Sequence, residues 1–321
     1  MVLDSVNYNL ADNDKSIFKR LWIYQSERFP VFAHGFLILA FSFSAVCYSA
    51  LLRQQAYFPS ISILLAAFAS ALIFFLLLRI ADEFKDAEED ARYRPYRAVP
   101  RGLVSFRELA FLAVCVLSIQ AVLAISWNTG LLWLLALVWL YLFAMSNEFG
   151  VKRWLKAHPF VYMWSHMLIM PLIDLYATSW DWMIVSGFPP KGLFWFLLLS
   201  FFNGMVIEVG RKIRAPESEE EGVETYSVLW GINTSVAIWL INLSLTAISA
   251  WMAAINVGFA WPVSILLIIL ISIAMVLGFK FMRSPSPALS KGIENFSGIW
   301  TILMYLSLGL LPMAWIVLRG L

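Results

Sequence analysis

Four acidic residues are crowded into one short segment of the sequence: Asp82, Glu83, Asp86 and Asp90. On an α-helix Glu83, Asp86 and Asp90 stand at positions i, i+3 and i+7, so they form one narrow stripe. Asp82 lies at its edge. Like charges about 5 to 6 Å apart repel one another unless a cation lies among them, and magnesium prefers such oxygen ligands. The spacing therefore predicts a magnesium site, and the alternative is a solvated acidic helix end.

A basic loop that contains prolines follows the acidic stripe directly. It carries Arg92, Arg94, Arg97 and Arg101 and closes with Gly102. A planar guanidinium can bind two phosphate oxygens at once. Metal-binding carboxylates beside phosphate-binding arginines make a site for a diphosphate, so the two segments together predict one.

A second charged segment lies further along the chain. Glu208 and Glu217 flank the cations Arg211 and Lys212, and both acids could supply carboxylate ligands. The three consecutive glutamates 219–221 cannot all face one site, so we interpret them as a solvated loop. This segment is predicted to lie at the same membrane edge as the first.

A third charged element is the pair Lys152 and Arg153, which follows an apolar stretch. Positive charges at such a position can fix the topology of a membrane helix. They can equally contact a diphosphate. The pattern alone leaves both interpretations open.

The thiols and imidazoles are not predicted to bind a metal. Cys47 and Cys115 both fall inside apolar stretches, where a thiol behaves as a small hydrophobic group. His34, His158 and His166 show no mutual spacing typical of ligands, and we expect each to be packed or interfacial.

The elements that must position these charges are membrane helices. The chain is 61% hydrophobic and only 14% charged, which excludes an ordinary soluble domain. A bilayer core of about 30 Å requires roughly 20 apolar residues in a helix. With that window we predict an all-α integral membrane protein with nine spans: 31–52, 58–81, 106–126, 130–148, 159–178, 192–210, 233–255, 259–281 and 298–318.

The basic residues are distributed very unevenly over the two sides of this arrangement. The amino terminus and the even-numbered loops hold 20 of the 23 lysines and arginines. The positive-inside rule therefore predicts a cytoplasmic amino terminus and, with nine spans, a carboxyl terminus on the opposite side. All the charged segments described above then lie in cytoplasmic loops.

The first thirty residues are predicted to be a cytoplasmic segment with an interfacial helix. Apolar residues recur near helical spacing within 13–29, between basic residues. Residues 31–321 form one membrane domain in this interpretation.

The acidic segment and its loop carry a family resemblance. Asp82-Glu-x-x-Asp86-x-x-x-Asp90, then Arg94-Pro and Pro100-x-Gly102, resembles the first signature of the UbiA superfamily of intramembrane prenyltransferases. That signature is usually written Asn-Asp-x-x-Asp-x-x-x-Asp. Here Asp82 stands for the Asn and Glu83 for the first Asp, and both replacements carry oxygen. Nine spans with cytoplasmic even-numbered loops are also what the resemblance implies.

The second charged segment resembles the family only in part. Its close, Gly222-Val-x-Thr225, is similar to the end of the family's second Asp-rich motif, for which Glu208 and Glu217 would supply carboxylates. Where many members have an aspartate, residues 211–214 are mostly cationic. Either these cations hold the diphosphate directly, or the second metal site is altered together with the reaction.

The resemblance implies a role for each candidate residue. It implies catalytic roles for Asp86, Asp90 and Lys152. The expected magnesium ligands are Asp82, Glu83, Asp86, Asp90, Glu208 and Glu217. The expected diphosphate contacts are Arg94, Arg97, Lys152, Arg153, Arg211 and Lys212. Aromatic residues that could line a prenyl channel are Tyr141, Tyr162, Trp164 and Phe201, although packing against lipid is an alternative for each.

The implied activity is a Mg2+-dependent transfer of an isoprenyl group from a prenyl diphosphate to a hydrophobic acceptor, expected to be aromatic. A terpene cyclase of the same superfamily, acting on the prenyl diphosphate alone, is the alternative. A transporter or lipid-binding protein is a third hypothesis. Transporters place ionisable groups near the bilayer midplane, whereas the predicted spans are apolar there. We expect a bacterial inner membrane location and no nucleic-acid partner.

Overall fold

A computed structural model of the chain describes residues 15–320, and every regular element in that range is helical. The long helices are α3 Val31–Leu52, α4 Ile61–Lys85, α6 Phe106–Trp127, α7 Leu131–Ser146, α10 Ile169–Val185, α11 Leu193–Gly210, α13 Ile232–Asn256, α14 Ala260–Arg283 and α15 Pro287–Leu308. The shorter ones are α2 Ile17–Arg28, α5 Ala87–Tyr93, η1 Glu148–Gly150, α8 Lys152–Lys156, α9 Pro159–Met167, η2 Pro216–Ser218, α12 Tyr226–Trp230 and α16 Leu310–Gly320. The all-helical membrane fold predicted from the sequence is confirmed.

Eight helical segments in the described part of the chain are long and apolar enough to cross a membrane. Two of them are joined pairs, α9 with α10 and α15 with α16. The predicted span 130–148 corresponds to α7, which is apolar but only 16 residues long. The predicted start at residue 58 differs from the observed α4, whose first turn begins after Ser60; the Ser60 hydroxyl accepts a hydrogen bond from the Ile63 amide.

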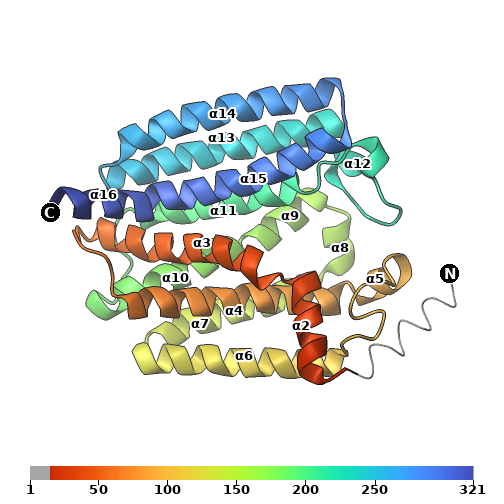
Figure 1. Ribbon diagram of the computed structural model, residues 1–321, viewed down its shortest axis with the longest axis horizontal. Helices are drawn as coiled ribbons and strands as arrows, with labels where there is room; N and C mark the ends of the chain where they lie inside the picture. The colour runs from red at the N-terminus through yellow and green to blue at the C-terminus, as the bar shows by residue number, and fades with distance from the viewer. Residues whose placement is uncertain (1–14, 321) are drawn as a thin grey trace.

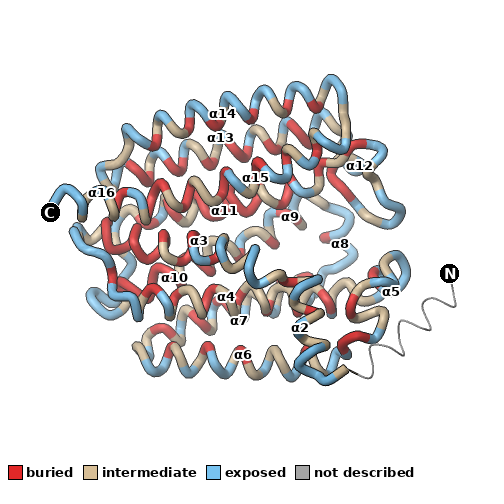
Figure 2. Tube along the Cα trace, in the orientation of Figure 1, coloured by how far each residue is buried: buried red, intermediate tan, exposed pale blue. Residues whose placement is uncertain are grey.

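The long helices lie side by side, and the short ones gather at one end of the bundle (Figure 1). Helices α5, α8 and α12 all lie at the end opposite the carboxyl terminus, and α2 crosses the bundle near them. Helix α11 packs against α10, α13 and α15, so it lies in the middle of the structure. Figure 2 shows that α11 is mostly buried, whereas α6 and α14 present exposed residues along their lengths.

Close contact between α11 and α15 fixes the end of α11 where charged residues follow. A Cβ on Gly210 would collide with the Ser297 hydroxyl, so only glycine lets the two backbones approach this closely. That hydroxyl also accepts a hydrogen bond of 2.9 Å from the Trp239 indole on α13. Three helices are therefore joined just before Arg211.

The helix predicted within residues 13–29 is observed as α2, and ion pairs hold it to the bundle. Arg20 contacts Glu108, at 2.5 Å between Nη2 and Oε1, and Arg28 Nε lies 2.5 Å from Glu83 Oε1. Between them the Tyr24 side chain is buried, while Phe18 and Trp22 are 82% and 61% exposed. Helix α2 thus presents one apolar face outward and binds the acidic end of α4 with the other.

Candidate active site

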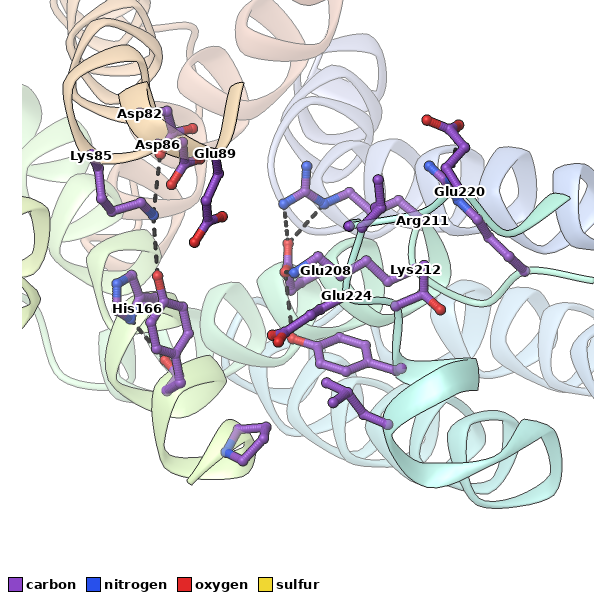
Figure 3. A pocket seen from close by; sticks show the side chains of 18 of the residues that line it. Asp82, Lys85, Asp86, Glu89, His166, Glu208, Arg211, Lys212, Glu220 and Glu224 are labelled. Atoms are coloured by element: carbon purple, nitrogen blue, oxygen red, sulfur yellow. Dashed lines mark hydrogen bonds and ion pairs between the residues drawn. The ribbon is translucent and has the colours of Figure 1, made fainter. Parts of the chain in front are cut away.

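A large cavity of about 1360 Å³ lies at the end of the bundle where the short helices gather. It is lined by residues from ten α-helices and from the loops between them; the helices are α2, α4, α5, α7, α8, α9, α10, α11, α12 and α15. Figure 3 shows Asp82, Asp86 and Glu89 on one side and Glu208, Arg211 and Lys212 on the other. The charged segments singled out in the sequence, from the second and sixth predicted spans, therefore converge on one space.

Asp86 stands at the junction of α4 and α5 and lines the cavity. Among the described residues its carboxylate has no hydrogen-bond or ion-pair partner. Partial burial raises its pKa, and the neighbouring carboxylates of Asp82, Glu89 and Asp90 raise it further, although Lys85 opposes them. The positive charge of Lys85 is therefore too little to offset the negative charge of Asp86 and its neighbours.

Asp82 lies beside Asp86 on the cavity wall. Its side chain is 40% exposed and is approached by two cations, Lys85 Nζ at 3.5 Å and Arg79 Nη1 at 3.6 Å. Neither distance is that of a short, direct hydrogen bond. The Asp82 oxygens therefore remain available to a further ligand.

Glu83 and Asp90 are buried and do not line the cavity. Glu83 is bound to Arg28, and the Asp90 oxygens accept hydrogen bonds from Arg94 at 2.9 Å and Arg97 at 2.6 Å. The single acidic stripe predicted from the sequence is divided because the helix is interrupted between Lys85 and Ala87.

Arg94 and Arg97 do line the cavity, and Asp90 determines where they lie. A buried carboxylate that accepts charge-assisted hydrogen bonds from two guanidinium groups holds both in a defined geometry. The structure therefore places the predicted diphosphate arginines at the cavity and places Asp90 behind them.

The opposite wall carries an acid compensated by two cations. Glu208 lies 2.5 Å from Arg211 Nη2 and 2.9 Å from Lys212 Nζ. This carboxylate raises the pKa of the Arg211 guanidinium, so Arg211 stays charged. The Lys212 ammonium also lies over the Tyr226 ring, 5.1 Å from its centre, and burial raises the pKa of that phenol. Fixed positive charge therefore faces the Asp82 side of the cavity.

Three sequence-predicted residues lie away from this arrangement. Glu217, Lys152 and Arg153 are exposed and are not among the residues that line the cavity. In α8, which begins at Lys152, the cavity-lining cation is Lys156, whose Nζ is 2.5 Å from Glu89 Oε1. That contact raises the pKa of Lys156.

Several cavity residues were not assigned to the site from the sequence: Arg28, Arg79, Lys85, Glu148 and His166. Arg79 lies within the predicted apolar span of α4, and charge in such a span is costly without a function or a partner. That rule could have identified Arg79, whereas Lys85 lies at the charged end of the helix. Of the four candidate channel aromatics, Tyr162 lines the cavity, and the other three do not.

The cavity-lining residues have the ligand types that magnesium requires at one position, the wall that carries Asp82 and Asp86. In the part of the chain that the structure describes, no three histidine, cysteine or acidic side chains are grouped to hold a metal by themselves. Magnesium, however, is commonly bound by one or two carboxylates and completed by substrate phosphates and water. Asp82 and Asp86 supply that pair, and the uncompensated charge of Asp86 favours a cation there. Glu208 is already neutralised by Arg211 and Lys212.

Comparison with known proteins agrees with the family resemblance of the acidic segment. A family model described as the UbiA prenyltransferase family matches residues 40–297. A search of curated proteins gives no match.

Solved structures resemble the fold. One is the apo structure of a UbiA homolog from Aeropyrum pernix K1, with a TM-score of 0.64, 13% identity, and 89% of this chain and 98% of that chain covered. Another comes from work on digeranylgeranylglyceryl phosphate synthase in membranes, with a TM-score of 0.60, 14% identity, and 93% and 99% covered. A third is a UbiA homolog from Archaeoglobus fulgidus bound to DMAPP and Mg2+, with a TM-score of 0.49, 12% identity, and 84% and 96% covered.

Proposed function

Because this chain belongs to the UbiA prenyltransferase family, we propose that it transfers an isoprenyl group from a prenyl diphosphate to a hydrophobic, aromatic acceptor with the help of Mg2+. The main support is one juxtaposition. Across one cavity the acids Asp82 and Asp86 face the cations Arg211 and Lys212. A diphosphate is the ligand that needs both, since its oxygens bind a metal on one side and guanidinium or ammonium groups on the other.

Asp82 and Asp86 would hold magnesium in this proposal. The metal supplies Lewis-acid neutralisation of the diphosphate, which makes it a better leaving group. Glu83 and Asp90 serve differently, because both are buried against arginines. They hold Arg28, Arg94 and Arg97 in place.

The arginines and Lys212 stabilise negative charge where it develops. As the bond between the prenyl carbon and the diphosphate oxygen breaks, charge grows on the diphosphate. Arg94 and Arg97 are held by Asp90, and Arg211 by Glu208, before any substrate arrives. Donors fixed in advance need no reorganisation during the reaction, which is how electrostatic catalysis lowers a barrier.

The apolar floor of the cavity is the proposed place for the prenyl tail. It is formed by Leu78, Met145, Met167, Ile169 and Met170, which come from four helices. Methionine side chains adapt to irregular apolar ligands. The tail would extend between helices toward the lipid. From the distribution of lysine and arginine, we place the cavity at the cytoplasmic side.

Release of inorganic diphosphate by the purified protein in lipid nanodiscs tests this function. Geranyl, farnesyl and geranylgeranyl diphosphate are each offered with Mg2+, with and without a phenolic acceptor. We expect release that EDTA abolishes, together with a prenylated acceptor. Asp86→Asn should lower the rate at least about a hundredfold if the metal supplies several kcal/mol, whereas the exposed control Glu217→Gln should not.

Two results would contradict the proposal. Release without an acceptor, accompanied by a hydrocarbon product, would indicate cyclisation instead of transfer. Absence of release from all three diphosphates would reject both activities.

A further inference from the structure

Glu148 occupies an unusual position at the end of α7. Three consecutive residues, Glu148, Phe149 and Gly150, have positive φ angles of 49°, 54° and 73°. Residues with a Cβ rarely adopt this left-handed conformation, and such backbone outliers cluster at functional sites. The turn carries the Glu148 side chain back toward the bundle, where it is 3% exposed and belongs to the cavity lining.

One oxygen of this buried carboxylate is not satisfied. Oε1 accepts only a long hydrogen bond of 3.5 Å from the Tyr162 hydroxyl. Oε2 has no hydrogen-bond partner among the residues that the structure describes. A buried carboxylate oxygen without a donor carries a substantial desolvation cost. A donor from a ligand in the cavity would remove that cost.

His166 presents a second unsatisfied atom in the same region. It is 7% exposed, lines the cavity, and stacks on Tyr162 with 4.0 Å between ring centres. Its Nδ1 lies 2.8 Å from the Tyr162 carbonyl oxygen, which can only accept a hydrogen bond. We assign the proton to Nδ1 on this ground, so Nε2 of the neutral ring is an acceptor. Within residues 15–320 that Nε2 has no partner.

The two orphaned atoms therefore belong to one patch with a single chemical character. Glu148 Oε2 and His166 Nε2 both accept hydrogen bonds, and Tyr162 lies against both residues. We name Glu148, Tyr162 and His166 the acceptor patch. Diphosphate oxygens only accept hydrogen bonds and are negatively charged, so they do not fit here. The ligand of this patch must bring hydrogen-bond donors.

Lys85 connects the acceptor patch to the proposed diphosphate site. Its ammonium lies 3.2 Å from the Tyr162 hydroxyl and 3.5 Å from an Asp82 oxygen. A group bound at the patch therefore lies one side chain away from the metal-binding acids. The patch and the proposed diphosphate site therefore share one cavity.

We propose that the acceptor patch is the subsite that binds the hydroxyl groups of the aromatic acceptor substrate. The inference rests on the proposed function and adds the residues that recognise the hydroxyl groups of the acceptor, namely Glu148 and His166 with Tyr162 between them. An acceptor whose head group is a bare carboxylate or phosphate is excluded from this patch, because it would be repelled by Glu148 and would donate no hydrogen bond.

Equilibrium binding to the purified protein in nanodiscs tests the proposal with two matched probes, hydroquinone and its dimethyl ether. We expect hydroquinone to bind and the ether, which has no donor, to bind at least about tenfold more weakly, as the loss of a hydrogen bond to a charged group predicts. In Glu148→Gln the affinity for hydroquinone should fall about tenfold. His166→Phe should also weaken it, while the exposed control His158→Phe should not.

Binding of farnesyl diphosphate with Mg2+ is measured on the same variants. Unchanged diphosphate affinity in Glu148→Gln, with a melting temperature no lower than that of the unmodified protein, shows that the patch serves the acceptor alone. The proposal is overturned if hydroquinone and its ether bind equally, if neither binds, or if both variants keep full hydroquinone affinity. An equal loss of diphosphate affinity would also overturn it, by assigning the patch to the diphosphate site. Failure of the proposed function is distinct, since it appears as no diphosphate release by the unmodified protein.

Discussion

Arg28 Nε lies 2.5 Å from Glu83 Oε1, and this ion pair joins α2 to the acidic end of α4. The Glu83 side chain is 1% exposed and that of Arg28 is 13% exposed. Arg28 also lines the cavity and lies 3.9 Å from Asp90. An arginine from the amino-terminal segment therefore stabilises two acids that the sequence assigned to metal binding.

Removal of Arg28 should destabilise the protein. Arg28→Met leaves the Glu83 charge buried without a partner, which we expect to cost about 3 kcal/mol of unfolding free energy. Chemical unfolding of the purified protein in detergent measures this loss. Because the double variant with Glu83→Met has no stranded charge, it should recover much of the stability.

The exposed pair Lys291 and Glu294 provides a control for that experiment. Its side chains are 63% and 44% exposed, so Lys291→Met should change the unfolding free energy by less than about 1 kcal/mol. Equal losses for Arg28→Met and Lys291→Met would contradict a special role for the buried pair.

Asp86 should decrease the stability of the metal-free protein at neutral pH. Its pKa is raised in the folded protein, so the charged form is disfavoured there relative to the unfolded chain. The penalty is absent below the ordinary carboxyl pKa of about 4 and develops as the pH rises through the raised value. Asp86→Asn should therefore melt at a higher temperature than the unmodified protein at pH 7 in EDTA, and the difference should shrink toward pH 4. A variant less stable at pH 7 would contradict this.

Asp90 should act on substrate binding through Arg94 and Arg97. In Asp90→Asn both arginines remain, but they lose the carboxylate that fixes them, so the KM for the prenyl diphosphate should rise about tenfold. Glu217→Gln is the control, because Glu217 is an exposed acid that does not line the cavity. A tenfold rise in both variants would indicate a general charge effect instead of positioning.

The all-helical membrane fold and the main charged segments that line the cavity could be predicted from the sequence. Hydropathy predicted α3, α6 and α14 within a few residues, because an apolar run in lipid has to be helical. It could not predict the break between α9 and α10 at Leu168, which divides one apolar run. It also could not predict that Asp174, inside α10, is fully buried and accepts a hydrogen bond of 2.9 Å from the Tyr305 hydroxyl.

The spacing of the acids was informative about which residues come together, but not about their partners. Glu83 and Asp90 resemble metal ligands locally, and only the folded chain brings Arg28 from 55 residues away to Glu83. Glu148 was missed for a related reason. Its position in the cavity depends on the left-handed turn at residues 148–150, which the local residue pattern does not predict.

Hyperfine coupling between Mn2+, substituted for Mg2+, and the phosphorus nuclei of bound farnesyl diphosphate tests the proposed site most directly. We predict that the coupling is present in the unmodified protein, lost in the double variant Asp82→Asn/Asp86→Asn, and retained in Glu208→Gln, where the substituted acid is already neutralised by Arg211 and Lys212. Coupling that survives in the Asp82→Asn/Asp86→Asn protein, or that disappears in Glu208→Gln alone, would contradict a diphosphate held through a metal at Asp82 and Asp86.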